Sequence, residues 1–508
     1  MQPQAQTNEP TPQQVFEEGY RLMRMGDVHE ASKRAGKLRA HFPEDIPVLT
    51  FHGLVLARLG IHAQALSDLI KAAQLTEQAL QNDEEENPNR PRIVDQLIRL
   101  CVQICHSSIA INEYKAAGEA ISNALKWDPD RGDAVAAKAQ LLATQGEFNE
   151  AMALIKQAQK DKLDSYPIVL AKASILIANE SSSAKDLSEV QAELDTESQV
   201  AGHGALELGD LLRVLGNVNH QLGEFDDAFG AYRRAAKLRR GSHDPRAHTM
   251  MTTKVIHDWN REAFGKLVRP EESGEKIVLL LGAPQSGTEE LASMLGQFDD
   301  VSVIGPLETL SATCVRHLNA RQGVLRPVPF EPTKLRGKQL EEANKTYLSQ
   351  TGLIMQGATR GVDTHPHNIP LAGVAAAFMP GVNIVMCRRD PMESTLATYC
   401  DAMIGNHPYA GDLLNTAGFV ADCNRMMDHW SEVLSDEFVG ANVVTVEYAD
   451  LAKDPKKVAA KVAREIGLDA RATAIKAVPS FASGPESIVD AYQSFTKPIE
   501  GFFDPASA

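Results

Sequence analysis

The chain has 508 residues, which is too long for a single hydrophobic core and predicts roughly two to four domains. Its formal net charge of -16 at pH 7 argues against a general nucleic-acid binder, because neutralising a phosphate backbone requires surplus Lys and Arg. The first residues (MQPQAQTNEPTPQQ) lack the basic and apolar regions of a secretory signal, and no stretch approaches the roughly 18 apolar residues of a membrane span. We therefore expect a cytoplasmic protein without a membrane span.

The cysteines do not suggest disulfide or metal chemistry. There are six, none of them in a CxxC pair, and the spacing of Cys101 and Cys105 is typical of small buried residues on a helix. No cluster of His, Cys, Asp and Glu has the spacing of metal ligands. We expect free thiols in a reducing compartment and no metal site.

The first half of the chain repeats with a period of about 34 residues. The register is marked by small residues, turn glycines and closing prolines at Gly26, Pro43, Gly60, Ala65, Tyr114, Pro129, Gly146, Ala151, Gly223 and Ala228. The glycines accommodate the left-handed turn that ends one helix, and the small residues let paired helices approach closely. This pattern resembles the tetratricopeptide repeat. It predicts an all-α solenoid over residues 12–245, with five clear repeats, a degenerate sixth at 166–201 and a charged inserted loop at 81–92.

Two interpretations of this array stay open. A tetratricopeptide solenoid implies a concave surface that binds a protein or peptide, but the array can also serve only to support the second half of the chain. The basic run from Arg233 to Arg240 is typical of a solvated helix end rather than an anion site.

The second half changes to a strand, loop and helix pattern. Residues 276–281 (KIVLLL) form a continuous apolar run suited to a central parallel strand, and the segment GAPQSGT (282–288) leads into a helix over 289–295. A glycine loop between a buried strand and a helix gathers main-chain N–H groups at the positive end of the helix dipole. The pattern therefore predicts an anion-binding loop. Thr288 stands where a Walker A loop has its lysine, which disfavours an ATPase or kinase.

The loop resembles the phosphosulfate-binding loop of the sulfotransferases, which reads roughly PRSGTT. A second buried strand, 383–387 (NIVMC), runs into Arg388 and Arg389, and this resembles the family's element for the 3′-phosphate of the donor. Later segments at 407–410, 427–430 and 444–451 follow in the order found in bacterial sulfotransferases with tetratricopeptide repeats. The resemblance implies an α/β, P-loop NTPase-like parallel-sheet domain over 274–505, joined to the array by a linker at 246–273.

The resemblance also implies a donor, 3′-phosphoadenosine-5′-phosphosulfate, and a set of residues to bind it. A guanidinium fixed at a strand end can meet a phosphate with two N–H bonds. The candidate donor-binding residues are Pro284, Gln285, Ser286, Gly287, Thr288, Arg388, Arg389, Ser394 and Ala397.

Several positions depart from the family pattern, and they are the positions expected to meet charge. Gln285 replaces the loop arginine, Glu289 replaces the second threonine, and Thr364 replaces the lysine of a TDKxPxN segment. Ala397 replaces the serine that partners the 3′-phosphate, for which Ser394 or Thr398 could substitute. Each lost charged hydrogen bond is worth about 1.5–3 kcal/mol, so donor binding is expected to be weaker than in the family.

A base must take the proton of the acceptor hydroxyl or amine. The resemblance suggests Glu308 for this role, because related enzymes carry a glutamate after the loop helix; His365 and His367 are the alternatives, since imidazole titrates near neutrality. We thus expect a sulfotransferase that acts on a hydroxyl or amine of a protein, peptide or glycan. The alternative is a catalytically degenerate sulfotransferase fold that serves as a protein-binding adaptor.

Overall fold

The structure is a computed structural model of the chain. It describes residues 11–25, 27–82, 87–111, 113–163, 165–238, 243–305, 309–318, 331–401, 408–479 and 488–503. The chain divides into two compact units, one formed by residues 1–243 with 399–412 and the other by residues 244–398 with 413–508.

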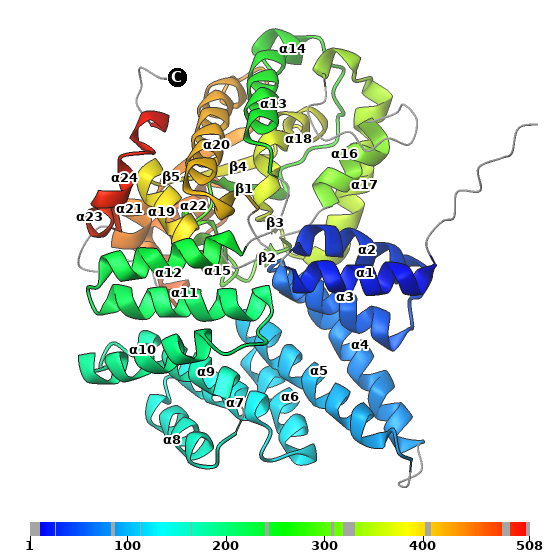
Figure 1. The fold of residues 1–508 in the computed structure, drawn as a ribbon. Helices are drawn as coiled ribbons and strands as arrows, with labels where there is room; N and C mark the ends of the chain where they lie inside the picture. The colour runs from blue at the N-terminus through cyan, green and yellow to red at the C-terminus, as the bar shows by residue number, and fades with distance from the viewer. Residues whose placement is uncertain are drawn as a thin grey trace, which may run out of the picture. The chain divides into compact units, whose positions relative to one another are not determined.

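The first unit is a series of antiparallel helix pairs (Figure 1). Its helices are α1 (Pro12–Arg24), α2 (Val28–His41), α3 (Ile46–Arg58), α4 (His62–Gln81), α5 (Arg90–Ala110), α6 (Tyr114–Trp127), α7 (Gly132–Thr144), α8 (Phe148–Lys160), α9 (Ser165–Ala178), α10 (Ala184–Ser198), α11 (Ala205–Gln221) and α12 (Phe225–Lys237). They make six pairs in the described part of the chain, so the stretch predicted as a degenerate repeat also forms a pair, α9 with α10.

Glycine acts in this unit both at the turns and between the helices. Gly60, Gly146 and Gly223 have φ of 77°, 87° and 77°, which confirms the left-handed turns predicted at these positions. Gly53 lies where an added Cβ would meet the Leu69 side chain at 2.7 Å, so its lack of a side chain allows α3 and α4 to pack closely. The helix pairing therefore depends on the residues that mark the repeat in the sequence.

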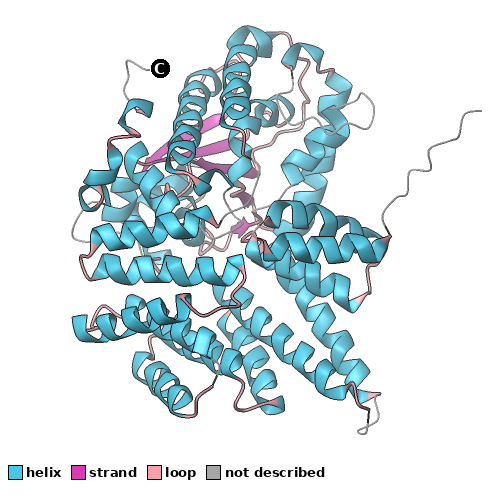
Figure 2. Ribbon diagram, in the orientation of Figure 1, coloured by secondary structure: helices cyan, strands magenta, loops and turns pink. Residues whose placement is uncertain are grey.

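The second unit contains one parallel sheet (Figure 2). Its strands are β1 (Ile277–Gly282), β2 (Val301–Val303), β3 (Arg360–Asp363), β4 (Asn383–Arg388) and β5 (Asn442–Glu447), in the order β2-β3-β1-β4-β5. All four neighbouring pairs are parallel, with Gly282 opposite Cys387. The predicted α/β parallel-sheet domain is thus confirmed.

Helices cover both faces of this sheet. The helices of the second unit are α13 (Pro245–Asp258), α14 (Arg261–Gly265), α15 (Thr288–Leu295), α16 (Thr309–Leu318), α17 (Gly337–Met355), α18 (Ala372–Phe378), α20 (Leu413–Leu434), α21 (Tyr448–Lys453), α22 (Pro455–Glu465), α23 (Ile488–Ala491) and α24 (Gln493–Thr496). Helix α19 (Pro391–Asp401) follows β4 and ends in residues grouped with the first unit. Alternate residues of β1 enter two cores: Leu279 packs with Trp430 of α20, and Leu280 with Leu291 of α15 and Val462 of α22. The continuous apolar run of β1 is explained by this burial on both faces.

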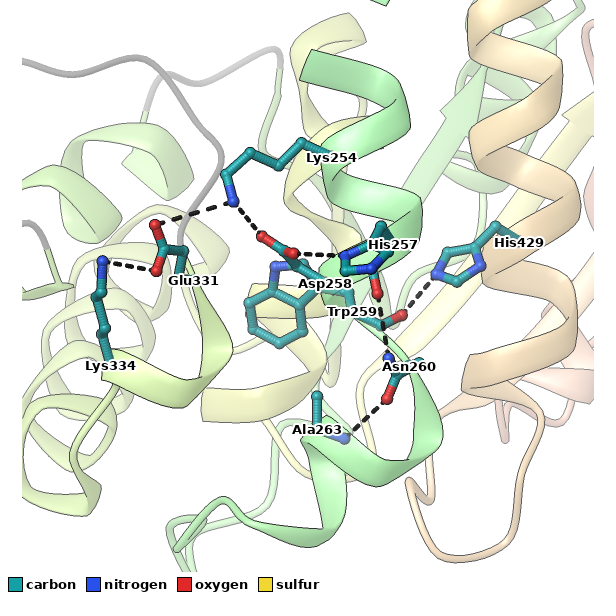
Figure 3. Close-up of polar contacts among 9 residues, drawn as sticks. All are labelled: Lys254, His257, Asp258, Trp259, Asn260, Ala263, Glu331, Lys334 and His429. Carbon is teal, nitrogen blue, oxygen red and sulfur yellow. Dashed lines mark hydrogen bonds and ion pairs between the residues drawn. The ribbon is translucent and has the colours of Figure 1, made fainter. Parts of the chain in front are cut away.

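The predicted linker at 246–273 is wrong, because this stretch is folded into the second unit. It contains α13 and α14, and Thr249 of α13 donates a hydrogen bond to the buried Asp422 of α20 at 2.7 Å. Figure 3 shows the turn between the two helices, where His429 Nε2 donates to the Trp259 carbonyl at 2.6 Å and the Asn260 side chain caps α14. These long-range bonds make the segment part of the domain core.

The six cysteines are free thiols rather than disulfides, as predicted, and all of them are buried, including Cys101 and Cys105, for which the sequence predicted burial. Burial raises the pKa of Cys101 to about 11 and that of Cys105 to about 12. Among the described residues, none of the helices combines the length and the apolar character needed to cross a membrane.

Candidate anion-binding site

The two predicted binding segments lie at the same edge of the sheet. β1 and β4 are neighbouring parallel strands in register from Val278 with Asn383 to Gly282 with Cys387. The loop after β1 and the arginines at the end of β4 therefore leave the sheet side by side at its carboxyl edge. This edge is where open α/β sheets bind their ligands.

The loop turns sharply before α15 begins. Gln285 has φ of 61° and Gly287, the residue before the helix, has φ of 91°. The first N–H groups of a helix have no partner within the helix, so those at the start of α15 face the loop as potential anion donors. Ser286 is buried, and its hydroxyl has no hydrogen-bond partner among the described residues. An unsatisfied buried donor at a helix N-terminus is a feature that an anionic ligand would explain.

Two loop positions have no room for a side chain. A Cβ at Gly282 would overlap the Ser286 hydroxyl, and a Cβ at Gly287 would lie 2.9 Å from the Tyr448 ring and 3.0 Å from Leu451. The loop is thus packed tightly against α21. Its glycines are required by close approach as well as by backbone conformation.

Side chains of α19, together with Arg389 just before it, hold the loop by its carbonyl groups. Ser394 donates to the Pro284 carbonyl at 2.6 Å, with Thr398 at 3.4 Å from the same oxygen, and Arg389 Nη1 donates to the Gln285 carbonyl at 3.0 Å. In a trans peptide the carbonyl and the next N–H point in opposite directions. The N–H groups of Gln285 and Ser286 are therefore turned away from α19, and the loop has a fixed shape without a ligand.

Arg389 is a cation that donates a hydrogen bond directly to the loop. Its side chain is 5% exposed, its Nε donates to Glu393 Oε2 at 3.1 Å, and its guanidinium carbon lies 4.2 Å from the centre of the Tyr448 ring. Its Nη2 has no hydrogen bond among the described residues. One N–H face of the guanidinium is therefore available to a further acceptor.

The other predicted residues at this edge have different roles. Arg388 pairs with Asp428 of α20 at 2.6 Å and donates to Ser431 at 3.2 Å, so its described bonds join β4 to α20 rather than to the loop. Ala397 is buried and its methyl group offers no hydrogen bond. Direct hydrogen bonds join Arg389 to Gln285 and Ser394 to Pro284. These bonds hold the shape of the loop.

Of the three candidate bases, the structure describes the side chain of His365. Glu308 lies outside the described residues, and so does the side chain of His367. His365 follows β3, is buried, and its main-chain N–H donates to Asp363 at 3.1 Å. Asp363 also accepts the hydroxyl of Tyr347 at 2.9 Å, and burial together with this carboxylate raises the pKa of Tyr347 well above its ordinary value.

Two residues at this site were missed from the sequence. Glu393 was visible in the sequence as a carboxylate four residues after Arg389, and it lies in the first turn of α19. Tyr448 follows β5 directly and so belongs to the same carboxyl edge of the sheet. A search for partners of the predicted cation could have found the first; the second needed the strand order.

Comparisons with known proteins agree with this architecture. Residues 278–472 match the model of the sulfotransferase family, and residues 109–175 match the tetratricopeptide repeat. The chain thus joins tetratricopeptide repeats to a sulfotransferase-family domain, and the predicted family is confirmed. An uncharacterized protein of Aquifex aeolicus is 22% identical over 257 residues, which are 48% of this chain and 33% of that protein. The match therefore spans only about a third of the curated relative.

Solved structures of both kinds are similar to the chain. A tetratricopeptide repeat protein from Parabacteroides merdae is 14% identical with a TM-score of 0.32, and the match covers 47% of this chain and 82% of that one. Sulfotransferase STF1 from Mycobacterium tuberculosis is also 14% identical, with a TM-score of 0.24 and coverage of 64% and 97%.

Proposed function

We propose that the second unit transfers a sulfuryl group from 3′-phosphoadenosine-5′-phosphosulfate to a hydroxyl or amine of a protein, peptide or glycan. The observation that carries this proposal is the loop 282–288, which joins a buried strand to a helix N-terminus and is held by α19. Main-chain N–H groups in such a loop bind phosphate groups. Thr288 in place of a lysine and the family match over 278–472 favour a sulfuryl over a phosphoryl donor.

The donor has two anionic ends, and the site offers one group of donors for each. Main-chain N–H groups of residues 285–288 and the Ser286 hydroxyl would hold the 5′-phosphosulfate. The Nη2 group of Arg389 would hold the 3′-phosphate. Ser394 would act through the loop, since its hydroxyl already bonds the Pro284 carbonyl. The residues present thus fit the nucleotide, although with fewer cations than the family pattern has.

The bound donor would supply an activated sulfuryl group. The acceptor oxygen or nitrogen forms a bond to sulfur while the bond between sulfur and the 5′-phosphate oxygen breaks, and adenosine 3′,5′-bisphosphate leaves with that electron pair. The acceptor proton goes to a base, for which Glu308 and then His365 are the candidates. Because sulfuryl transfer resembles phosphoryl transfer, its rate depends mainly on positioning and charge. Gln285 supplies no cation there, so we expect a slow enzyme.

The helix pairs of the first unit would select the acceptor. Stacked helix pairs present extended surfaces that suit a protein or peptide. This assigns partner binding to the array and chemistry to the sheet edge.

One observation favours the second candidate, a catalytically degenerate adaptor. Carboxylates stand near both anion positions, with Glu289 exposed in the first turn of α15 and Glu393 paired with Arg389. Each would oppose a bound polyanion.

Calorimetry with adenosine 3′,5′-bisphosphate separates the two candidates. The enzyme predicts micromolar binding to the full chain that weakens at least about tenfold in Arg389→Ala, since a charged hydrogen bond is worth roughly 1.5–3 kcal/mol. Arg425→Ala is the matched control, because Arg425 lies on α20 and pairs with Asp422. Absence of binding at millimolar nucleotide would leave the adaptor as the function.

A further inference from the structure

Arg389 is held by a carboxylate from its own segment of the chain. Glu393 Oε2 accepts from Arg389 Nε at 3.1 Å, and the glutamate side chain is 31% exposed while that of the arginine is 5% exposed. The guanidinium is thus fixed on one side by a carboxylate that solvent reaches. A second nitrogen of the guanidinium, Nη1, donates to the Gln285 carbonyl.

The position of Glu393 is one that suits an anion. It lies in the first turn of α19, where the positive end of the helix dipole favours negative charge, and its N–H is capped by Asp390 at 3.0 Å. A helix N-terminus beside a buried guanidinium is the environment in which proteins bind phosphate groups. The Glu393 carboxylate therefore accepts from a guanidinium N–H that could otherwise donate to a phosphate.

We propose that Glu393 is an internal competitor for the 3′-phosphate of the donor, so that the nucleotide must displace or share its carboxylate to reach Arg389. This inference rests on the proposed function. It makes Glu393 a specificity-determining residue, because the competition lowers affinity only for nucleotides that carry a 3′-phosphate. The Ser394 hydroxyl holds the Pro284 carbonyl independently of Glu393, so the loop keeps this support when the carboxylate is displaced.

The test compares two nucleotides and two variants of the full chain by calorimetry. Adenosine 3′,5′-bisphosphate carries the 3′-phosphate, and adenosine 5′-phosphate lacks it. Glu393→Gln removes the competing charge but keeps the side-chain length. Glu341→Gln is the matched control, because Glu341 on α17 also pairs with a cation four residues away, Lys345, at 2.6 Å.

We expect Glu393→Gln to bind the bisphosphate roughly three- to tenfold more tightly than the natural chain. The nucleotide then no longer has to compete with the partly exposed ion pair between Glu393 and Arg389. Binding of adenosine 5′-phosphate should not change, and Glu341→Gln should affect neither nucleotide. Thermal unfolding of each variant, followed by tryptophan fluorescence, establishes that the second unit is folded.

The outcomes separate this inference from the proposed function. If the natural chain binds the bisphosphate and Glu393→Gln binds it equally or less tightly, the proposal that Glu393 competes with the nucleotide is refuted. The proposed function is then still supported. Equal tightening for both nucleotides also refutes competition by Glu393, since the effect is then not specific for the 3′-phosphate. If Glu393→Gln binds the bisphosphate and the natural chain does not bind it at millimolar concentration, competition by Glu393 is supported, while the natural chain fails the test of the proposed function. If neither protein binds, the proposed function fails and the inference fails with it.

Discussion

Replacing Gly287 by alanine tests whether the loop is packed as tightly as the structure indicates. At φ of 91° an L-residue is strained by about 1–2 kcal/mol. The new methyl group would also lie 2.9 Å from the Tyr448 ring and 3.0 Å from Leu451, and such overpacking typically costs about 1–3 kcal/mol. We therefore expect Gly287→Ala to destabilise the second unit by about 2–5 kcal/mol.

Tryptophan fluorescence measures this loss in the correct unit. Trp259 and Trp430 are buried in the second unit, whereas Trp127 of the first unit is 40% exposed, so the unfolding signal comes mainly from the second unit. For a domain of this size about 1 kcal/mol shifts the melting temperature by about 2–4 °C.

Gly357→Ala is the matched control. Gly357 also has positive φ, 96°, and lies in the second unit, but an added Cβ there would meet nothing within 4 Å. Gly357→Ala should therefore destabilise the second unit only by the cost of its backbone conformation, about 1–2 kcal/mol. Equal melting temperatures for the two variants would refute the close packing of the loop against α21.

Two further predictions concern the first unit and the cysteines. Burial alone would raise the pKa of Asp68, but its hydrogen bonds to His52 at 2.6 Å and Arg39 at 2.9 Å outweigh this and hold the pKa below its ordinary value. The ionised carboxylate thus stabilises the fold at neutral pH, and this contribution is lost as pH falls through the folded pKa. Urea unfolding followed by circular dichroism should show that Asp68→Asn is less stable than the natural chain at pH 7, and that this difference in stability disappears between about pH 5 and pH 2. A difference in stability that does not change with pH would contradict this role of Asp68. Because the six thiols are buried, a thiol reagent should modify them slowly in the native chain and all six in urea, whereas rapid native labelling would contradict their burial.

Much of the fold was predictable because its signals are local. The recurring glycines and small residues lie at helix turns and contacts, so their period predicted the helix pairs, including the sixth. The runs KIVLLL and NIVMC are apolar because both faces of the sheet are covered, and they predicted β1 and β4. The local pattern does not reveal that the stretch 246–273 is folded, because its partners, such as Asp422 and His429, are more than a hundred residues away in sequence.

The candidate site was predictable in its place but not in its bonds. A glycine loop and an arginine at two strand ends indicated one sheet edge, which the pairing of Gly282 with Cys387 provides. The direction of side chains did not follow from the pattern. Ser394 was predicted to meet a phosphate, yet it donates to the Pro284 carbonyl, and Arg388 joins Asp428 instead of the loop. These differences arise because a polar side chain beside a turned loop satisfies the nearest carbonyl or carboxylate.

A crystal structure of the full chain grown with adenosine 3′,5′-bisphosphate would show directly which groups hold the nucleotide. We expect one phosphate at the main-chain N–H groups of residues 285–288 and the other at Arg389, with the Glu393 carboxylate displaced or shared. Nucleotide bound elsewhere, or a crystal in which the loop holds none and the pair of Arg389 with Glu393 is intact at saturating ligand, would contradict it.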